Sequence, residues 1–403
     1  MKARYIALVA GLMACSLAWG QTDEKSSGQV MLKMSKKKPV KTENHAVEGS
    51  RSTTIHMTKQ KAETPALPAA SDAANGFAWM SPAFTSVKTA KNTYLVKGTV
   101  EASESIRFIN IFQNGQFVKN IIPAVPNMKQ MIIDEDVSLD LGPNEMKVEA
   151  VTVSGKKIQS NLNIVYDISL AKYFALVIAV EEYDDPNISD LDNPIDDAQR
   201  FINTIASRYT FEQENINFLK NPSKADIIGT LHKMRSELGS EDNLLIYYAG
   251  HGHYDEEMKT GYWLPSDAGR DNPVDWLPNT DLTNYLNVLK TKHTLLIADA
   301  CFSGGIFKTR AAFNNALEVE KLYSLNSRKA MTSGALSEVP DKSQFVHYLI
   351  QNLKDNSKKY MTSEQLYMDI KTPVINNSDN VPQFGTIQKV GDEGGDFIFI
   401  RRR

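Results

Sequence analysis

Two residues of this chain have the type and setting for nucleophilic catalysis, a cysteine and a histidine. Cys301 is one of only two cysteines among the 403 residues, the other being Cys15. A thiolate can attack a carbonyl carbon when a base takes the thiol proton and when hydrogen-bond donors hold the oxyanion that forms. His251 lies between Gly250 and Gly252, and glycine allows backbone to approach a substrate closely. The alternatives are an unreactive, buried Cys301 and a structural His251 at a strand end.

A second histidine competes for the role of base. His253 follows His251 by two positions, but only His251 has glycine on both sides. Cys301 is also followed closely by two glycines, in the string Ser303-Gly304-Gly305. We therefore expect His251 and Cys301 to form the reactive pair.

Alternating strands and helices are expected to position this pair. Expected strands cover 173–180, 215–220, 243–250 and 294–301, and expected helices cover 196–209, 223–238 and 280–289. This alternation predicts an α/β fold, a mostly parallel sheet covered by helices on both faces. Sites on such sheets lie beyond the carboxyl ends of the strands, where two of these strands present His251 and Cys301.

The first twenty residues are typical of an export signal. A basic start at 1–4 precedes an apolar run at 5–18, and Gln21 is the expected first residue of the mature chain. Part of this region also resembles a lipoprotein signal, in which Cys15 would carry the lipid. We expect an exported protein, periplasmic or secreted, without a membrane span in the mature chain. Cys301 then has no partner for an intramolecular disulfide.

Three further segments follow the signal at 1–20. Residues 21–80 lack a hydrophobic period and are expected to form a disordered linker or pro-segment. Residues 81–168 contain short alternating runs, with a hairpin signal at Asn114-Gly115. They predict five to seven strands in a small all-β sandwich of immunoglobulin-like type. Residues 169–403 form the α/β domain. The net charge of −3 favours neither nucleic acid nor an anionic membrane as partner.

Several strings of the α/β domain resemble the caspase-like cysteine peptidases of clan CD, which include caspases, metacaspases and paracaspases. The main strings are YFALVIAVEEY at 173–183, PIDDA at 194–198, YYAGHG at 247–252 and DACFSGG at 299–305. In caspases the histidine precedes the cysteine by about 50 residues. Here the interval is 301 − 251 = 50. The string YWLPSDA at 262–268 resembles the hairpin that follows the family histidine.

The resemblance implies a caspase-like endopeptidase that acts on proteins or peptides. His251 matches the catalytic histidine, Cys301 the nucleophile, and the backbone N–H groups of Gly252 and Cys301 the oxyanion donors. Asp197 and Asp299 match the acidic S1 positions of metacaspases and paracaspases, which cleave after Arg or Lys because carboxylates pair with a cationic side chain. The alternatives are a helix N-terminal carboxylate for Asp197 and a structural hydrogen-bond acceptor for Asp299.

The implied chemistry requires no cofactor, and the few histidines and cysteines predict no zinc site. Calcium activation, known in some metacaspases, stays open, and no third member of a catalytic triad is evident. The polar 306–330 loop contains four basic residues, at 308, 310, 321 and 328. Because relatives are often cut there, we expect self-cleavage in this loop. Two other functions compete: a catalytically inactive caspase-like scaffold or binding protein, and a legumain-like or gingipain-like peptidase.

Overall fold

In the computed structural model, residues 76–300, 306–308, 319–334 and 342–402 are described. The expected signal at 1–20, Cys15, and the expected linker up to residue 75 lie outside this range. Cys301 also lies outside it, directly after the described Ala300. None of the described helices is long and apolar enough to cross a membrane.

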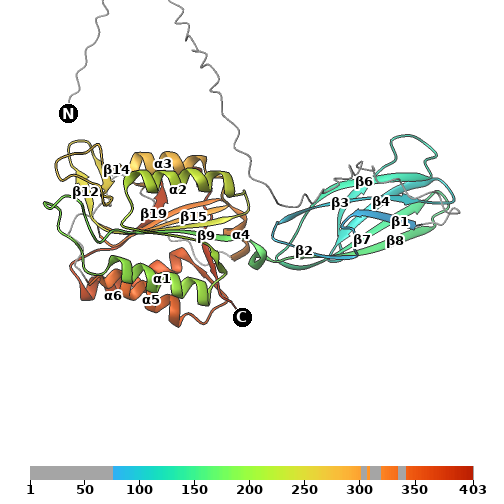
Figure 1. Ribbon diagram of the computed structural model, residues 1–403. Coiled ribbons are helices and arrows are strands. Elements are labelled where there is room, and N and C mark those ends of the chain that lie inside the picture. Colours follow the sequence, from blue (N-terminus) through green and yellow to red (C-terminus); the bar gives the residue numbers. More distant parts are fainter. Residues whose placement is uncertain (1–75, 301–305, 309–318, 335–341, 403) are drawn as a thin grey trace, which may run out of the picture. The chain divides into compact units, whose positions relative to one another are not determined.

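A seven-stranded sheet forms the centre of the α/β part, with the order β10-β9-β11-β15-β17-β19-β16 (Figure 1). The strands are β9 (Tyr173–Ala179), β10 (Phe211–Lys220), β11 (Asn243–Ala249), β15 (His293–Asp299), β16 (Phe307–Lys308), β17 (Ser327–Thr332) and β19 (Gln383–Ile387). The pairings from β10 to β17 are parallel, and β19 is antiparallel to both of its neighbours. Every residue of β11 and β15 is buried, as expected for strands covered on both faces.

Helices cover both faces of this sheet, as the sequence predicts. One face carries α1 (Pro194–Arg208), α5 (Gln344–Asp355) and α6 (Ser363–Asn377), and the other carries α2 (Lys224–Glu237) and α3 (Asn279–Val288) (Figure 1). Each face has its own apolar core, the first including Phe201 and Leu349 and the second including Leu231 and Leu286. The remaining short elements are α4 (Val319–Ser324), β18 (Tyr360–Thr362) and β20 (Ile398–Ile400).

Helix boundaries follow local sequence signals. Helix α2 begins after Ser223, whose hydroxyl accepts a hydrogen bond from the backbone N–H of Asp226 while the Asp226 carboxylate accepts one from the backbone N–H of Ser223. This reciprocal cap satisfies two donors that the first turn leaves unpaired. Helix α1 has Pro194 in its first turn, where the missing proline N–H has no consequence.

A three-stranded hairpin sheet follows the end of β11. It contains β12 (Gly252–Asp255), β13 (Thr260–Trp263) and β14 (Leu277–Pro278), all antiparallel. The hairpin expected after the histidine therefore occurs, and the 262–268 segment begins within its strand β13. Strand β12 begins one residue after His251.

The strand-rich region before the α/β part contains two sheets. Their orders are β1-β3-β6 and β2-β8-β7-β4-β5. The strands are β1 (Gly76–Ser81), β2 (Ser86–Thr89), β3 (Thr93–Glu101), β4 (Ile106–Gln113), β5 (Gln116–Ile121), β6 (Gln130–Ser138), β7 (Gly142–Thr152) and β8 (Lys157–Tyr166). Asn114 and Gly115 form the expected turn between β4 and β5, both with positive φ, the conformation that a two-residue hairpin loop favours.

Strand β1 differs from the expectation that residues up to 80 form a linker. It begins at Gly76 and pairs with β3 along its whole length. Phe77 and Trp79 stack on each other with ring centroids 5.3 Å apart, and the Trp79 indole N–H donates to Ser160. Strand β1 thus depends on contacts with β3 and β8, which the local sequence pattern does not show.

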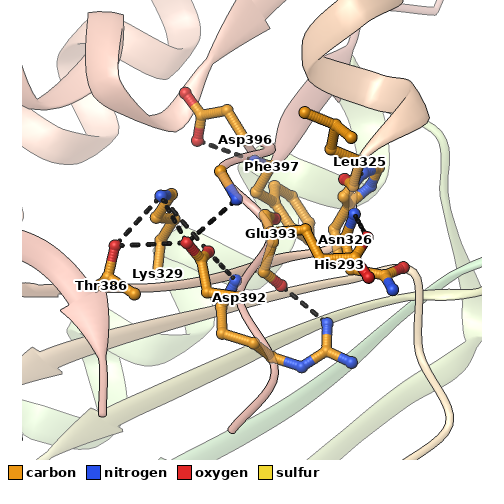
Figure 2. A network of polar contacts seen from close by, with 12 residues as sticks. His293, Leu325, Asn326, Lys329, Thr386, Asp392, Glu393, Asp396 and Phe397 are labelled. Carbon is orange, nitrogen blue, oxygen red and sulfur yellow. Dashed lines mark hydrogen bonds and ion pairs between the residues drawn. The ribbon is translucent and has the colours of Figure 1, made fainter. Parts of the chain in front are cut away.

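A polar network ties the C-terminal segment to β17 at the edge where the parallel strands begin (Figure 2). The Asp392 carboxylate lies 3.3 Å from Lys329 Nζ and accepts the backbone N–H groups of Arg328 and Gly394. Asp396, a few residues on, accepts from the hydroxyl of Ser363 and from the backbone N–H of Glu364, both at the start of α6. This network lies at the edge opposite to the strand ends that precede His251 and Cys301.

Candidate active site

The register of two neighbouring strands sets the position of the expected reactive pair. Strands β11 and β15 are parallel, and Ala249 lies opposite Asp299. The pairing continues beyond this point, since the Gly250 N–H is 3.5 Å from the Asp299 carbonyl oxygen. The offset between the strands is 299 − 249 = 50 residues, which equals the interval between His251 and Cys301. Each of these residues follows its strand by the same number of positions.

The imidazole of His251 has a defined partner. Its Nε2 lies 2.8 Å from the backbone carbonyl oxygen of Ser189. A carbonyl oxygen can only accept, so this hydrogen bond requires the proton on Nε2 and leaves Nδ1 as the nitrogen that can take a proton from a thiol. The sequence indicated no third member of a triad. In the structure, the Ser189 backbone carbonyl takes the place of a third side chain that orients the imidazole. Every residue type has a backbone carbonyl, so the sequence cannot indicate this partner.

The loop that carries Ser189 is held by its own hydrogen bonds. The Asp185 carboxylate accepts backbone N–H groups from Asn187 and Arg270, at 2.9 and 2.7 Å. The Leu191 N–H donates to the Glu181 carbonyl oxygen at 2.8 Å. These bonds connect the loop to Glu181, just after β9, and to Arg270, between β13 and β14. The Ser189 carbonyl therefore has a stable position beside the imidazole.

Gly252, the expected oxyanion donor, and His253, the competing histidine, both lie in β12. Gly252 is the first residue of β12, directly after His251, and pairs with Trp263. His253 is exposed on the same strand, with its ring 4.7 Å from that of Trp276. The structure therefore gives His251, and not His253, the position next to the end of β11.

Asp299 is the last residue of β15 and is buried. The pKa of Asp299 is raised to about 6, mainly by burial and to a smaller extent by the nearby charge of Asp197. The hydroxyls of Ser333 and Ser343 oppose this rise. Even so, Asp299 Oδ1 and Ser333 Oγ have no hydrogen-bond partner of good geometry among the described residues. Within the described residues, one oxygen of this buried carboxylate is therefore without a hydrogen-bond partner.

Asp197 lies in the first turn of α1 and is also buried. Burial raises the pKa of Asp197, while an ion pair with Arg200 one turn later opposes the rise. Both carboxylates act on the buried hydroxyl of Tyr247 and raise its pKa, after the larger effect of burial. Asp197 and Asp299 thus contribute to one acidic region, although α1 and β15 are distant in sequence.

Comparison with known protein families identifies the family of the chain. A family model described as the caspase domain matches residues 172–389. The chain belongs to the caspase family. This is a family of cysteine peptidases, and the α/β part of the chain has the caspase-like fold.

Two curated proteins to which the chain is similar are plant metacaspases. Metacaspase-9 of Arabidopsis thaliana is 29% identical over 130 residues, which are 29% of this chain and 40% of the relative. Metacaspase-6 of the same plant is 26% identical over 230 residues, 49% of this chain and 61% of the relative. The chain thus spans less than two thirds of the length of either relative.

Two crystal structures also match part of the chain at low similarity. A protein from Geobacter sulfurreducens has 17% identity and a TM-score of 0.39, with 56% of this chain and 99% of that one covered. Caspase-1 from Spodoptera frugiperda has 14% identity and a TM-score of 0.40, with 54% and 87% covered.

No group of three or more His, Cys, Asp or Glu side chains that could hold a metal ion occurs in the described ranges. The remaining histidine near the sheet, His293, is buried at the start of β15, where burial lowers its pKa to about 3. It lies at the opposite end of the strand from Asp299.

Proposed function

We propose that the protein is an exported cysteine endopeptidase that cleaves peptide bonds after Arg or Lys. Cys301 is the nucleophile and His251 the base. The observation that carries this proposal is the in-register pairing of β11 with β15, with Ala249 opposite Asp299. That pairing supports a meeting of the thiol and the imidazole at one edge of the sheet.

The proposed reaction has two stages. The Cys301 thiol gives its proton to His251 Nδ1, and the thiolate sulfur forms a bond to the scissile carbonyl carbon. The backbone N–H groups of Gly252 and Cys301 hold the oxyanion. The imidazolium returns its proton to the leaving amine as the C–N bond breaks, and His251 then activates a water that hydrolyses the thioester. Ser189 keeps the ring oriented through Nε2. The thiol itself is the nucleophile, so these steps use no cofactor.

The preference for Arg or Lys is supported by the acidic region beside this edge. Asp299 is buried, at the end of the strand that leads to Cys301, and Oδ1 lacks a partner in the part of the chain that is described. A cationic side chain would provide that partner, and pairing with it would favour the ionised carboxylate. Asp197 would contribute a second negative charge, shared with Arg200.

Location and the role of the β-rich region are further parts of the proposal. The N-terminal signal supports export, to a periplasm-like space or to the outside, with lipid attachment at Cys15 as the alternative. The two-sheet region over 76–166 would be an immunoglobulin-like module for docking or recognition. The basic residues at 308, 310 and 321 support self-cleavage between β15 and β17, whereas Arg328 is buried within β17.

The test is a panel of fluorogenic peptides ending in Arg, Lys, Asp or Asn. Purified wild type is compared with Cys301→Ala and His251→Ala. We expect release from the Arg and Lys peptides by wild type alone. Turnover of the Asp or Asn peptide instead would refute the assignment of the pocket. No turnover of any peptide would favour the scaffold function.

A further inference from the structure

The backbone of His251 is held from both sides by tyrosine hydroxyls. Its N–H donates to the hydroxyl oxygen of Tyr183 at 2.8 Å. Its carbonyl oxygen accepts from the hydroxyl of Tyr248 at 2.6 Å and, at the longer distance of 3.1 Å, from the backbone N–H of Leu264. Neither tyrosine is among the site residues that the sequence predicts.

Both tyrosines are themselves fixed. Tyr248 belongs to β11, and its ring stacks on that of Trp263 with centroids 4.2 Å apart and an angle of 11°. The backbone N–H of Tyr183 donates to the Asp190 carboxylate at 2.9 Å, and its ring lies 5.1 Å from the His251 ring. Burial raises the pKa of the Tyr183 hydroxyl well above its ordinary value, so this group stays neutral and remains a hydrogen-bond partner.

Gly250 makes room for the two hydroxyls. A Cβ at this position would lie 2.9 Å from the Tyr248 hydroxyl oxygen and 3.2 Å from that of Tyr183. Any other residue at 250 would therefore push against both groups. The glycine before the histidine has a packing reason that is separate from access to substrate.

We propose that Tyr183 and Tyr248 form a clamp that positions His251 and Gly252 for catalysis. The clamp fixes the peptide groups on both sides of the His251 Cα atom. Tyr183 holds the His251 N–H and so sets the direction of the imidazole. Tyr248 holds the His251 carbonyl oxygen and so sets the orientation of the peptide group that carries the Gly252 N–H. Tyr183 and Tyr248 are positioning residues, because they act through the base and through an oxyanion donor.

Kinetics on full-length protein tests the clamp, and this readout rests on the proposed function. Tyr183→Phe and Tyr248→Phe keep both rings and remove one hydroxyl each. Small displacements of a catalytic group reduce turnover strongly, so kcat for an Arg-terminated peptide should fall about 10- to 100-fold, with KM within about threefold. The double variant should lose much less than the product of the single effects, because both hydroxyls hold one residue.

Tyr209→Phe is the matched control. The Tyr209 hydroxyl is fully buried and donates to the Leu353 carbonyl oxygen at 2.8 Å, at the far end of α1. Its loss should lower the melting temperature about as much as the other two changes, with kcat retained. The clamp is refuted if Tyr183→Phe and Tyr248→Phe keep kcat within about twofold, or if Tyr209→Phe reduces kcat as much as they do.

Hydrogen exchange of the His251 amide, followed by mass spectrometry of short peptic fragments, gives an answer that needs no enzyme activity. The amide should exchange slowly in wild type and Tyr209→Phe, and about tenfold or more faster in Tyr183→Phe. Equal exchange in all three proteins would overturn the clamp. If wild type cleaves no peptide, the proposed function fails, and the exchange rates alone decide whether the tyrosines hold His251.

Discussion

At the scale of single residues, the candidate site depends on the absence of a side chain at Gly250. Gly250→Ala places a methyl group within 2.9 Å of the Tyr248 hydroxyl. The displaced His251 should reduce kcat by about tenfold or more. Gly229→Ala is the control, because no atom lies within 4 Å of a Cβ added at this helical position. It should retain activity and gain about 0.5–1 kcal/mol of stability. Equal activity of both variants would contradict the packing argument.

Asp299 should reduce stability while it supports substrate binding. Its pKa is raised from 3.8 to about 6 in the folded protein, so the folded state resists ionisation. The resulting loss of stability is absent below about pH 4, grows as the pH rises, and is complete above about pH 6. Asp299→Asn should therefore stabilise the protein by roughly 1–3 kcal/mol at about pH 7.5, and by much less at about pH 4.

The same Asp299→Asn variant should lose cleavage of Arg and Lys peptides. Chemical denaturation at both pH values and peptide turnover are the measurements. A variant that is less stable than wild type near neutral pH, or that cleaves Arg peptides with unchanged KM, would show that Asp299 is not the incompletely paired S1 carboxylate described above.

Much of this site can be predicted from residue types, and some of it cannot. The interval of 50 residues and the glycines indicated His251, and the in-register pairing of β11 with β15 gives that interval a structural cause. The Ser189 carbonyl was missed because backbone atoms leave no trace in residue type. Tyr183 and Tyr248 were missed because a tyrosine within or just after an apolar strand is most often a packing residue.

At the scale of elements, the polar network at the start of β17 should contribute strongly to stability. Lys329 and Asp392 form an ion pair with side chains only 14% and 7% exposed (Figure 2). Removing one partner leaves a buried charge without compensation, so Asp392→Ala should destabilise the fold by about 3–5 kcal/mol. The exposed pair Lys97–Asp134 is the control, and Asp134→Ala should change stability by less than about 1 kcal/mol. Equal denaturation midpoints for the two variants would contradict this account.

Elements with strong periodicity were predicted well, and elements defined by long-range pairing were not. The buried runs and amphipathic segments of the α/β part gave β9, β11, β15 and α1 to within a few residues. The fold class is confirmed. Strand β1 was assigned to the linker because its pairing with β3 involves residues that the local pattern does not connect.

Arg328, expected in a polar loop, is buried in β17, with its guanidinium donating to three backbone carbonyls. The segment open to cleavage is therefore shorter than 306–330.

At the scale of the whole molecule, the sheet order predicts what self-cleavage would produce. Cleavage after Arg310 would leave β16 on the first fragment and β17 and β19 on the second. Because β17 pairs with β15, and β19 lies between β17 and β16, the fragments would share one sheet. Wild type should give two bands on a denaturing gel and elute as one species in size-exclusion chromatography. Cys301→Ala should stay one band. One intact band for both proteins under activating conditions would contradict self-cleavage.

The central claim is that the Cys301 thiol and the His251 imidazole meet at the rim of the sheet. The direct measurement is the alkylation rate of Cys301 by iodoacetamide, in a Cys15→Ser background where it is the sole thiol. An imidazole in contact with the thiol favours the thiolate, so at about pH 6 alkylation should be at least about tenfold faster than in His251→Ala. Equal alkylation rates with and without the imidazole would contradict the account.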